Sequence, residues 1–390
     1  MTGDGSGTQN SNEPKNSKFK QQQLPAWQPI LTAGTVLPTF FVIGIAFVPI
    51  GVGLMYFSNQ VNEVVLDYTE CVRANANNIQ QPTSDELCSK VIAPEDWDLS
   101  GNKCICYADI DIGATDWDGP VYMYYGLTNF YQNHRRYVKS RDDKQLYGQI
   151  ETEPSKDCEP FRKNNDTDKY YAPCGAIANS MFNDKITLEY SEKGGEPWSD
   201  VPLLKTGIAW PSDKEYKFKN PEYEKSDDPT QDWQNLKAEF DAKNLESPKD
   251  WKTEIWKLDT ENPDNNGFLN EDLIVWMRTA ALPNFRKLYR KIDHQNQNDP
   301  TFANGLPADK KYRLRIEYNY KVVQFSGTKK IILATTSLLG GKNPFLGIAY
   351  IVVGCICLVL GVIFLFIHLR FGKTPQDIMN IGPRTPYNAN

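Results

Sequence analysis

The sequence predicts a membrane protein with two transmembrane α-helices and a large ectodomain, which is a mainly antiparallel β-sandwich with helical insertions. Three observations lead to this fold class. Two long apolar stretches, residues 35–57 and 345–369, contain no charged side chain. The segment between them is so polar that the mean hydropathy of the chain is −0.54 in spite of both stretches. Within that segment, strand-like runs alternate with turn-rich linkers, which is typical of a β domain.

Each apolar stretch is long enough to cross a bilayer. As a helix, residues 345–369 would span about 37 Å, and the hydrocarbon core is about 30 Å thick. No small-residue cleavage site follows residues 35–57, so we do not interpret them as a signal peptide. The expected segments are an N-terminal tail at 1–32, transmembrane helices at 33–57 and 343–369, an ectodomain at 58–342 and a C-terminal tail at 370–390.

The distribution of charge predicts the orientation of these segments. Lys18 and Lys20 precede the first helix, and Arg370 and Lys373 follow the second. By the positive-inside rule both tails are cytosolic and the ectodomain faces the lumen or the exterior. The net charge is −6, and the acidic excess lies in the ectodomain because both tails carry more basic than acidic residues. An acidic domain argues against nucleic acid as a partner.

Six of the eight cysteines lie in the ectodomain, and an even number in an oxidising compartment predicts three disulfides. Two of the six are isolated from the rest and should pair with each other. In the C-x-C sequence at 104–106, both side chains would lie on one face of a strand, which suggests two nested bridges. The spacing does not fit a zinc site. The expected bridges are Cys158–Cys174, Cys88–Cys104 and Cys71–Cys106, with Cys355 and Cys357 free in the second helix.

Glycines recur every seven residues in both apolar stretches, so they lie on one face of each helix. Small residues on one stripe let membrane helices approach closely, although glycine is also common in such helices in general. The spacing predicts a packing face but leaves open whether the two helices contact each other or a partner. The residues are Gly44, Gly51, Gly347, Gly354 and Gly361.

Periodicity predicts the elements of the ectodomain. The region 191–265 has no clear periodicity and should form long surface loops, whereas 271–292 is the best helix candidate, broken or kinked at Pro283. The N-terminal residues 1–20 have the composition of a disordered segment, and Trp27 should lie at the headgroups. Strands are expected at 64–69, 105–112, 121–125, 312–320 and 329–336, the last two as a hairpin through Ser326 and Gly327.

A single N-x-[ST] sequon, Asn165-Asp166-Thr167, lies in a polar stretch of the expected ectodomain. Because this segment should face the lumen or the exterior, we predict that Asn165 is glycosylated.

No pattern in the sequence supports catalysis, a cofactor or a metal. Among the three histidines only His134 has candidate partners nearby, and the arginines beside it are better explained by ion pairs and aromatic stacking. Residues 262–272 resemble a calcium loop, but Leu273 stands where the bidentate glutamate is required. Two uncharged helices cannot line a pore by themselves. The profile is that of an accessory subunit or a receptor-like interaction protein.

Several longer stretches resemble one family, the cell-division-cycle-fifty or ligand-effect-modulator family. In sequence they are closer to the animal members of this family than to the fungal ones. The resemblance follows the chain in order over nearly its whole length, with the same two-helix topology. The matching stretches are AWQP at 26–29, NFYQNHRRYVKSRDDKQ at 129–145, PCGAIANSMFND at 173–184, GIAW at 207–210, NNGFLNEDLIVWMRTAALPNFRKLYR at 265–290 and GGKNPFLGIAY at 340–350.

The resemblance implies a non-catalytic β-subunit of a type IV P-type ATPase, a phospholipid flippase. Such a subunit forms a heterodimer with the ATPase, lets it leave the endoplasmic reticulum, and supports aminophospholipid transport to the cytosolic leaflet. Its ectodomain would be a jelly-roll-like sandwich, and its locations the endoplasmic reticulum, Golgi, endosomes and plasma membrane. Many relatives have Asn-Asp-Thr where this chain reads Asn183-Asp184-Lys185, so that glycan site is absent here.

We expect two sets of residues to bind the partner, and one alternative function stays open. The glycine faces of both helices should pack against the ATPase. In the ectodomain, Asn133, His134, Arg135, Arg136, Trp276 and Arg278 should form or support the contact surface, unless they are ordinary packing residues. The alternative is a free-standing cell-surface receptor or adhesion protein, which the short tails without a folded domain disfavour.

Overall fold

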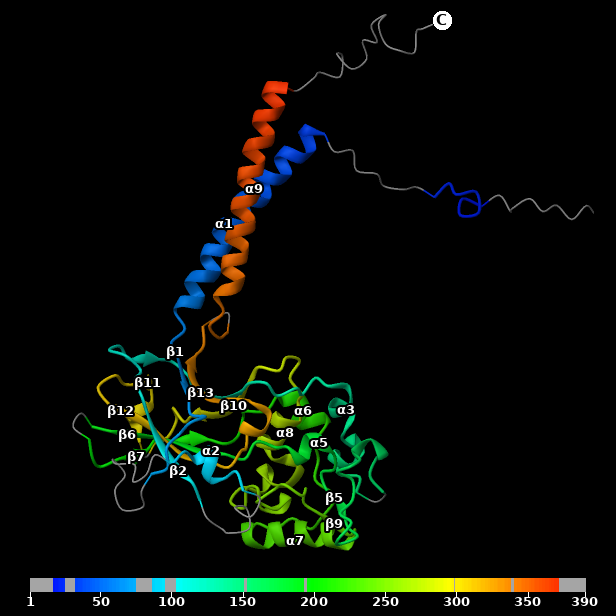
Figure 1. Cartoon of the computed structure of the whole chain (residues 1–390), viewed down its shortest axis with the longest axis vertical. Helices are drawn as coiled ribbons and strands as arrows, with labels where there is room; N and C mark the ends of the chain where they lie inside the picture. The colour runs from blue at the N-terminus through cyan, green and yellow to red at the C-terminus, as the bar shows by residue number, and fades with distance from the viewer. Residues whose placement is uncertain are drawn as a thin grey trace, which may run out of the picture. The chain divides into compact units, whose positions relative to one another are not determined.

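The computed structural model describes residues 17–24, 32–74, 86–94, 103–150, 153–192, 195–297, 299–337 and 340–371 (Figure 1). It forms two compact units. One contains two long helices, and the other is the ectodomain, Tyr56–Asn343. Most of both tails, including Trp27, lies outside the described residues.

The two expected membrane helices are present. Helix α1 is Ala33–Asn59 and helix α9 is Pro344–Phe371. Both are long and apolar enough to cross a membrane by length and composition. Pro38 and Pro49 lie inside α1, where each removes one backbone hydrogen-bond donor.

The ectodomain is mainly antiparallel β-sheet, as expected. The larger sheet has the order β1 (Glu63–Asp67), β13 (Lys329–Thr335), β4 (Val121–Leu127), β10 (Phe285–Ile292) and β8 (Leu203–Leu204). The second sheet has the order β2 (Ile105–Ile110), β12 (Lys311–Glu317), β6 (Lys185–Ser191) and β7 (Ser199–Asp200). Two short pairs are separate, β3 (Trp117–Asp118) with β11 (Gly305–Leu306) and β5 (Tyr170–Tyr171) with β9 (Leu245–Glu246).

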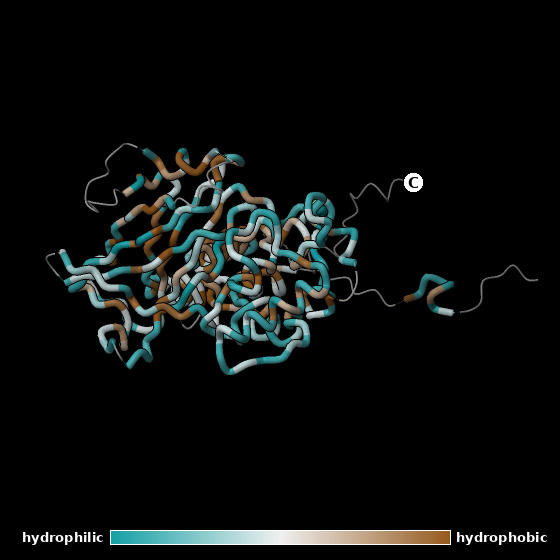
Figure 2. The backbone as a smooth tube through the Cα atoms, turned by 90° about the horizontal axis from the view of Figure 1, so that it is seen from below, coloured by the Kyte–Doolittle hydropathy of each residue, from teal (hydrophilic) through white to brown (hydrophobic). Residues whose placement is uncertain are grey.

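Both large sheets contribute side chains to one hydrophobic core. Met123 and Leu333 come from the first sheet, and Leu188 and Leu314 come from the second, and all four are at most 1% exposed. Figure 2 shows apolar residues gathered in the interior of the ectodomain and hydrophilic residues in its outer loops. Two sheets that share one core agree with the predicted sandwich, whereas the jelly-roll topology stays a prediction.

Helices of the ectodomain lie largely on one side of it, where α3, α5, α6, α7 and α8 are labelled in Figure 1. Their sequences explain their ends, because Asp228 caps α7 and Asn270 caps α8 through side-chain oxygens that accept backbone N–H groups. The helices are α2 (Cys88–Val91), α3 (Arg135–Lys139), α4 (Asp143–Leu146), α5 (Ala176–Asn179), α6 (Pro211–Tyr216), α7 (Pro229–Ala242) and α8 (Glu271–Met277). Single 3-10 turns are η2 (Lys156–Cys158), η3 (Ile255–Lys257), η4 (Pro263–Asn265), η5 (Gly267–Leu269), η6 (Pro300–Phe302) and η7 (Val323–Phe325).

The expected helix over 271–292 is only partly correct. Its first part is α8, but its second part is strand β10, which pairs with β4 and β8. Lys287 explains the end of the helix, because its ammonium group donates to the carbonyls of Val275, Trp276 and Arg278 at 3.2, 2.6 and 2.8 Å. The last carbonyls of α8 therefore accept hydrogen bonds from a lysine of strand β10, and not from backbone N–H groups of a further helical turn.

The expected hairpin between 312–320 and 329–336 is wrong. Both strands exist, but β12 belongs to the second sheet and β13 to the first. The intervening chain crosses between the sheets, and the side chain of Asp184 accepts the N–H groups of Asn319 and Tyr320 on the way. The expectation of loops over 191–265 is also wrong in part, because it missed the 14-residue helix α7.

The three expected disulfides are all present, namely Cys71–Cys106, Cys88–Cys104 and Cys158–Cys174. Cys355 and Cys357 are free, as expected. The nested pair joins the chain after β1 to strand β2 and its approach, and the third bridge joins η2 to the turn that precedes α5. Covalent links of this kind hold segments that the core alone does not fix.

Candidate partner-binding surface

The segment 129–136 is held against the segment 280–284 by hydrogen bonds. The side chain of Asn133 donates to the carbonyl of Ala281 at 2.8 Å, and the buried side chain of Gln132 accepts the N–H of Ala280 at 2.9 Å. The N–H of Phe130 donates to the carbonyl of Pro283. The ring of Phe130 makes edge contacts with neighbouring aromatic rings, among them Trp276 at 5.7 Å between centroids. These contacts fix the backbone on which the exposed side chains stand.

Arg278 links this region to the stretch 207–210. Its guanidinium lies over the ring of Trp210, 4.7 Å from the centroid, and pairs with Asp213 at 3.1 Å. The backbone of this stretch is in turn bound to α8, because Glu271 accepts the N–H groups of Ile208 and Ala209 at 2.7 and 2.9 Å. Burial alone would raise the pKa of Glu271, but hydrogen bonds from Ala209 and Lys214 lower it below its usual value.

Together these segments present one exposed surface, which we call the arginine–aromatic surface. Its apolar members are large for exposed residues, with Tyr131 at 57%, Trp210 at 63% and Leu282 at 68% exposure. Tyr, Trp and Arg are the residue types enriched at the energetic centres of protein interfaces. The members are Tyr131, Asn133, His134, Arg135, Arg136, Trp210, Arg278 and Leu282.

The charge on this surface is positive and in part uncompensated. Arg135 and Arg136 are exposed on α3, and within the part of the chain that the structure describes neither forms an ion pair. Arg278 shares Asp213 with Lys217. A guanidinium without a local partner is available for a carboxylate on another molecule, which it can bind through two parallel hydrogen bonds.

Trp276 lies beneath this surface and not on it. It is fully buried, and its indole N–H donates to the carbonyl of Ile177 at 2.7 Å. The ammonium group of Lys287 lies 4.8 Å from the centre of its ring. Of the six ectodomain residues expected at the contact surface, five are exposed, and Trp276 can only support them from within the core.

The glycine faces do not point to a partner, which corrects the expectation. A Cβ atom added at Gly51 would lie 2.9 Å from the carbonyl oxygen of Gly347, and one at Gly44 would lie 3.0 Å from that of Gly354. At Gly361 an added Cβ would lie 3.3 Å from the ring of Phe41, a side chain of the other helix. Each face is therefore occupied by the other helix, because only glycine lets the backbones of α1 and α9 come this close.

Asn165 is exposed in a turn, as a glycosylation site must be. The hydroxyl of Thr167 in the sequon donates to Glu246, 2.9 Å away. In the calcium-like loop the amides serve internal contacts, since Asn265 donates to Asp259 and Asn270 caps α8. No group of three or more His, Cys, Asp or Glu side chains in the described part of the chain is placed to hold a metal ion.

Sequence reasoning missed three members of the surface, namely Tyr131, Trp210 and Leu282. Tyr131 and Leu282 lie within two of the stretches that resemble the family, 129–145 and 265–290. Trp210 is the last residue of a third, GIAW. Periodicity could not identify them, because all three stand outside regular strands and helices or at their ends. Only the exposure of the folded chain distinguishes them from core residues.

Comparison with known proteins gives the family. The family model described as LEM3 (ligand-effect modulator 3) family / CDC50 family matches residues 54–374. Cell cycle control protein 50A of Bos taurus is 50% identical over 94% of this chain and 91% of its own length. Cell cycle control protein 50B of Homo sapiens is 41% identical over 94% and 97%. ALA-interacting subunit 3 of Arabidopsis thaliana is 39% identical over 92% and 87%. Matches of this length and identity mean that the chain belongs to the CDC50/LEM3 family.

Proposed function

We propose that this chain is the non-catalytic β-subunit of a type IV P-type ATPase that transports phospholipids. Family membership over nearly the whole chain, including both candidate membrane helices, is the observation that carries the proposal. One relative, ALA-interacting subunit 3 of Arabidopsis thaliana, is by its name a subunit that interacts with another protein. In this function the chain binds the ATPase as a heterodimer, accompanies it out of the endoplasmic reticulum, and supports transport of aminophospholipids to the cytosolic leaflet.

The architecture supports a role in holding another protein. The two helices use their glycine faces on each other, and large apolar side chains such as Val42, Ile45 and Val359 remain exposed on their other sides. These sides can contact lipid or the helices of the ATPase. The arginine–aromatic surface offers exposed aromatic anchors and unpaired arginines, so it fits a partner loop that carries carboxylates. Both tails are cytosolic in this proposal.

The test of the function is export of the ATPase. A type IV ATPase expressed alone in cells that lack family members should remain in the endoplasmic reticulum, and co-expression of this chain should release it. Surface biotinylation measures the exported fraction. The proposal predicts a clear increase with this chain and none with a tagged, unrelated two-helix membrane protein. Equal export in both cases would contradict it, and a chain that reaches the surface without any ATPase would favour the receptor alternative.

The contact surface is tested separately by substitution. Arg135→Ala with Arg136→Ala, Trp210→Ala and Arg278→Ala should each reduce co-purification of the ATPase, with losses of about 2 kcal/mol for a central residue. Lys225→Ala is the matched control, because Lys225 is an exposed cation on another part of the ectodomain, paired with Asp264. Full co-purification with Arg278→Ala would remove Arg278 from the contact surface, while the proposed function would stand.

A further inference from the structure

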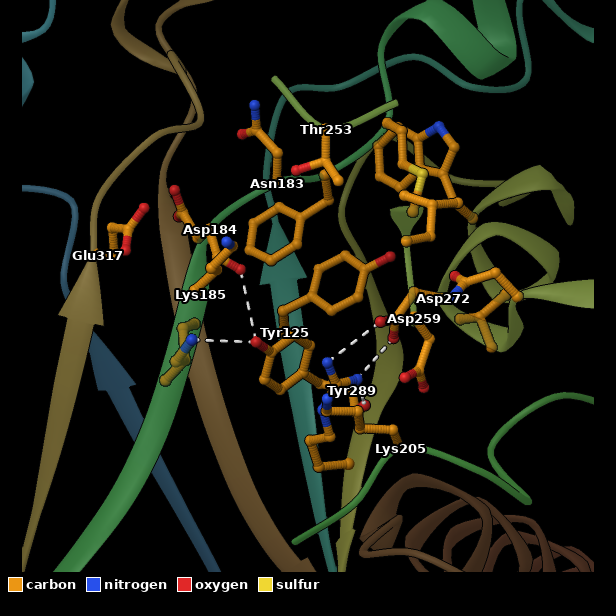
Figure 3. A pocket seen from close by; sticks show the side chains of 18 of the residues that line it. Tyr125, Asn183, Asp184, Lys185, Lys205, Thr253, Asp259, Asp272, Tyr289 and Glu317 are labelled. Atoms are coloured by element: carbon orange, nitrogen blue, oxygen red, sulfur yellow. Dashed lines mark hydrogen bonds and ion pairs between the residues drawn. The ribbon is translucent and has the colours of Figure 1, made fainter. Parts of the chain in front are cut away.

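A large cavity, partly open to solvent, lies in the ectodomain between the strands and the helical side. Its volume is about 590 Å³, which is within the range of about 300–1,000 Å³ that is usual for small-molecule sites. Strands β4, β6 and β10 and helix α8 contribute to its wall. Figure 3 shows Tyr125 and Tyr289 in the cavity, with Lys205, Asp259 and Asp272 around them. The function proposed above gives this cavity no role.

The floor of the cavity is aromatic and apolar. The ring of Phe182 stacks on Tyr125 at 4.1 Å between centroids and 2° between planes, and Tyr289 meets Tyr125 edge-on at 6.3 Å. Leu288 and Trp276 complete this part of the lining. Such a floor favours the apolar body of a ligand, because the ligand buries its own surface against it.

One polar group on this floor lacks a partner. Tyr125 is only 4% exposed, and in the described part of the chain nothing hydrogen-bonds to its hydroxyl, which faces the cavity. The side-chain oxygen of Asn183, also in the lining, is buried without a partner among the described residues. A buried polar atom without a hydrogen bond costs about 1–3 kcal/mol, so a ligand that donates to the Asn183 oxygen would relieve this cost, while the Tyr125 hydroxyl is free to bond to the same ligand.

The free charges of the lining are mostly positive. Most of its carboxylates already pair with cations. Asp272 binds Arg290 through two oxygens at 2.6 and 3.1 Å, Asp184 binds Lys329, and Glu317 binds Lys103. In contrast, Lys185 and Lys205 are exposed lining residues that form no ion pair within the described residues. Among the carboxylates of this lining, only that of Asp259, bonded to Asn265, forms no ion pair with a cation in the described part of the chain.

We propose that this cavity is a binding site for an amphipathic phosphate ester, whose apolar body lies on the aromatic floor while its phosphate contacts Lys205. The hydroxyl of Tyr125 bonds to a polar atom between the two. A lysine ammonium group binds phosphate as a point charge, and the floor selects against ions that lack an apolar part. A lipid headgroup with its glycerol and a free phosphate share this chemistry, so the test must distinguish them.

Calorimetric titration of the full chain in mild detergent tests the site. The probes are dihexanoyl-phosphatidylserine and inorganic phosphate. We expect saturable binding of the lipid with one site per chain. Tyr125→Phe should weaken it about three- to tenfold, since it removes one hydrogen bond, and Lys205→Gln should weaken it about tenfold. Tyr124→Phe and Lys217→Gln are matched controls, because neither residue lines the cavity.

Each outcome decides the proposal. Binding of the lipid that falls in the two cavity variants but not in the controls supports a lipid ligand. Equal binding of inorganic phosphate with the same dependence would show that the aromatic floor adds nothing to affinity, and would overturn the proposal of an amphipathic ligand. No saturable binding of either probe would overturn the proposal, as would binding that the cavity variants leave unchanged while their thermal unfolding is normal. No ATPase takes part in the titration, so failure here is distinct from failure of the proposed function.

Discussion

At the scale of single residues, Asp184 connects its own segment with those of Lys329 and Tyr68. Its carboxylate binds the ammonium of Lys329 at 2.7 Å and accepts the hydroxyl of Tyr68 at 2.8 Å, and both members of the ion pair are fully buried. Burial lowers the pKa of Lys329 to about 8, against the opposing effect of Asp184. It also raises the pKa of Tyr68 well above its usual value. Because Asp184 precedes β6 of the second sheet and Lys329 begins β13 of the first, this buried ion pair joins the two sheets.

Removal of one member of this pair should destabilise the chain strongly. Lys329→Met leaves a buried carboxylate without its cation, so we expect a loss of about 3–5 kcal/mol in the free energy of unfolding. The neighbouring Lys330→Met is the control, since its pair with Asp67 is 3.7 Å long and exposed, and it should cost at most about 1 kcal/mol. Denaturant unfolding of the full chain in detergent measures both. Adding Asp184→Leu to Lys329→Met should recover part of the loss, and equal effects of the two single variants would contradict this interpretation.

Lys287 gives the stability a dependence on pH. The usual pKa of a lysine is about 10.4. Burial lowers the pKa of Lys287 well below that value. Between these two values the unfolded chain binds more protons than the folded chain, so the free energy of unfolding rises with pH. We expect this increase below about pH 10, where ordinary tyrosines are still largely protonated, and Lys329 adds to it because burial lowers its pKa to about 8. Thermal unfolding of the full chain measures it. Lys287→Met should reduce the slope, and an unchanged slope would contradict the assignment.

Sequence reasoning at this scale succeeded for the cysteines and failed for the lysines. Isolation in sequence and the C-x-C spacing were enough to give all three disulfides. Nothing in the sequence marks Lys287 or Lys329 as buried, because lysine is almost never buried without a partner. Lys287 finds its partners at the end of α8, which the chain reaches only by folding back, and Lys329 finds Asp184 in the distant segment before β6. Such contacts exist only in the folded chain.

At the scale of helices and strands, local patterns gave the type of most elements but not their pairing. The strand 312–320 and the strand 329–336 were recognised, yet their adjacency in sequence suggested a hairpin that the core does not allow. In 271–292 the same apolar residues suit a helix or a strand. The backbone of β4 decides between them, because it pairs with 285–292.

The close contact between α1 and α9 depends on glycine at defined positions. Gly51→Ala should disturb it, because the added Cβ would lie 2.9 Å from two backbone atoms of α9, and overpacking of this kind costs about 1–3 kcal/mol. Gly53→Ala is the matched control in the same helix, since nothing lies within 4 Å of its added Cβ. Thermal unfolding of the full chain in detergent should show a loss only for Gly51→Ala. A loss of equal size in both variants would contradict the contact.

At the scale of the whole molecule, the orientation predicted from the flanking charges has a direct consequence for modification. Asn165 should carry a glycan, which requires the ectodomain to face the lumen. Treatment with an N-glycosidase should shift the electrophoretic mobility of the wild-type chain and not that of Asn165→Gln. The control Asn183→Gln should keep the shift, because Lys185 stands where a sequon needs Ser or Thr. An unshifted wild-type chain would contradict the prediction.

The large-scale plan was the most predictable part of the molecule, because two uncharged apolar stretches and six cysteines between them determine it. The candidate surface was predictable only in part. The stretch 133–136 was recognised from its residues, whereas Trp210 joins it through the folded contacts of Glu271 and Arg278. Leu282 joins it because Asn133 donates to the carbonyl of the neighbouring Ala281. The contact made by the glycine faces was not predictable. The spacing of the glycines does not show whether each face packs on the other helix of this chain or on a helix of another protein.

The central claim is that this chain works as the subunit of an ATPase, and one purification tests it most directly. The tagged full chain is isolated from cells in mild detergent, and the proteins that accompany it are identified and quantified. We predict a type IV P-type ATPase in a one-to-one ratio, with ATP hydrolysis that phospholipid stimulates. A chain that purifies alone after it has left the endoplasmic reticulum unaided would contradict the claim.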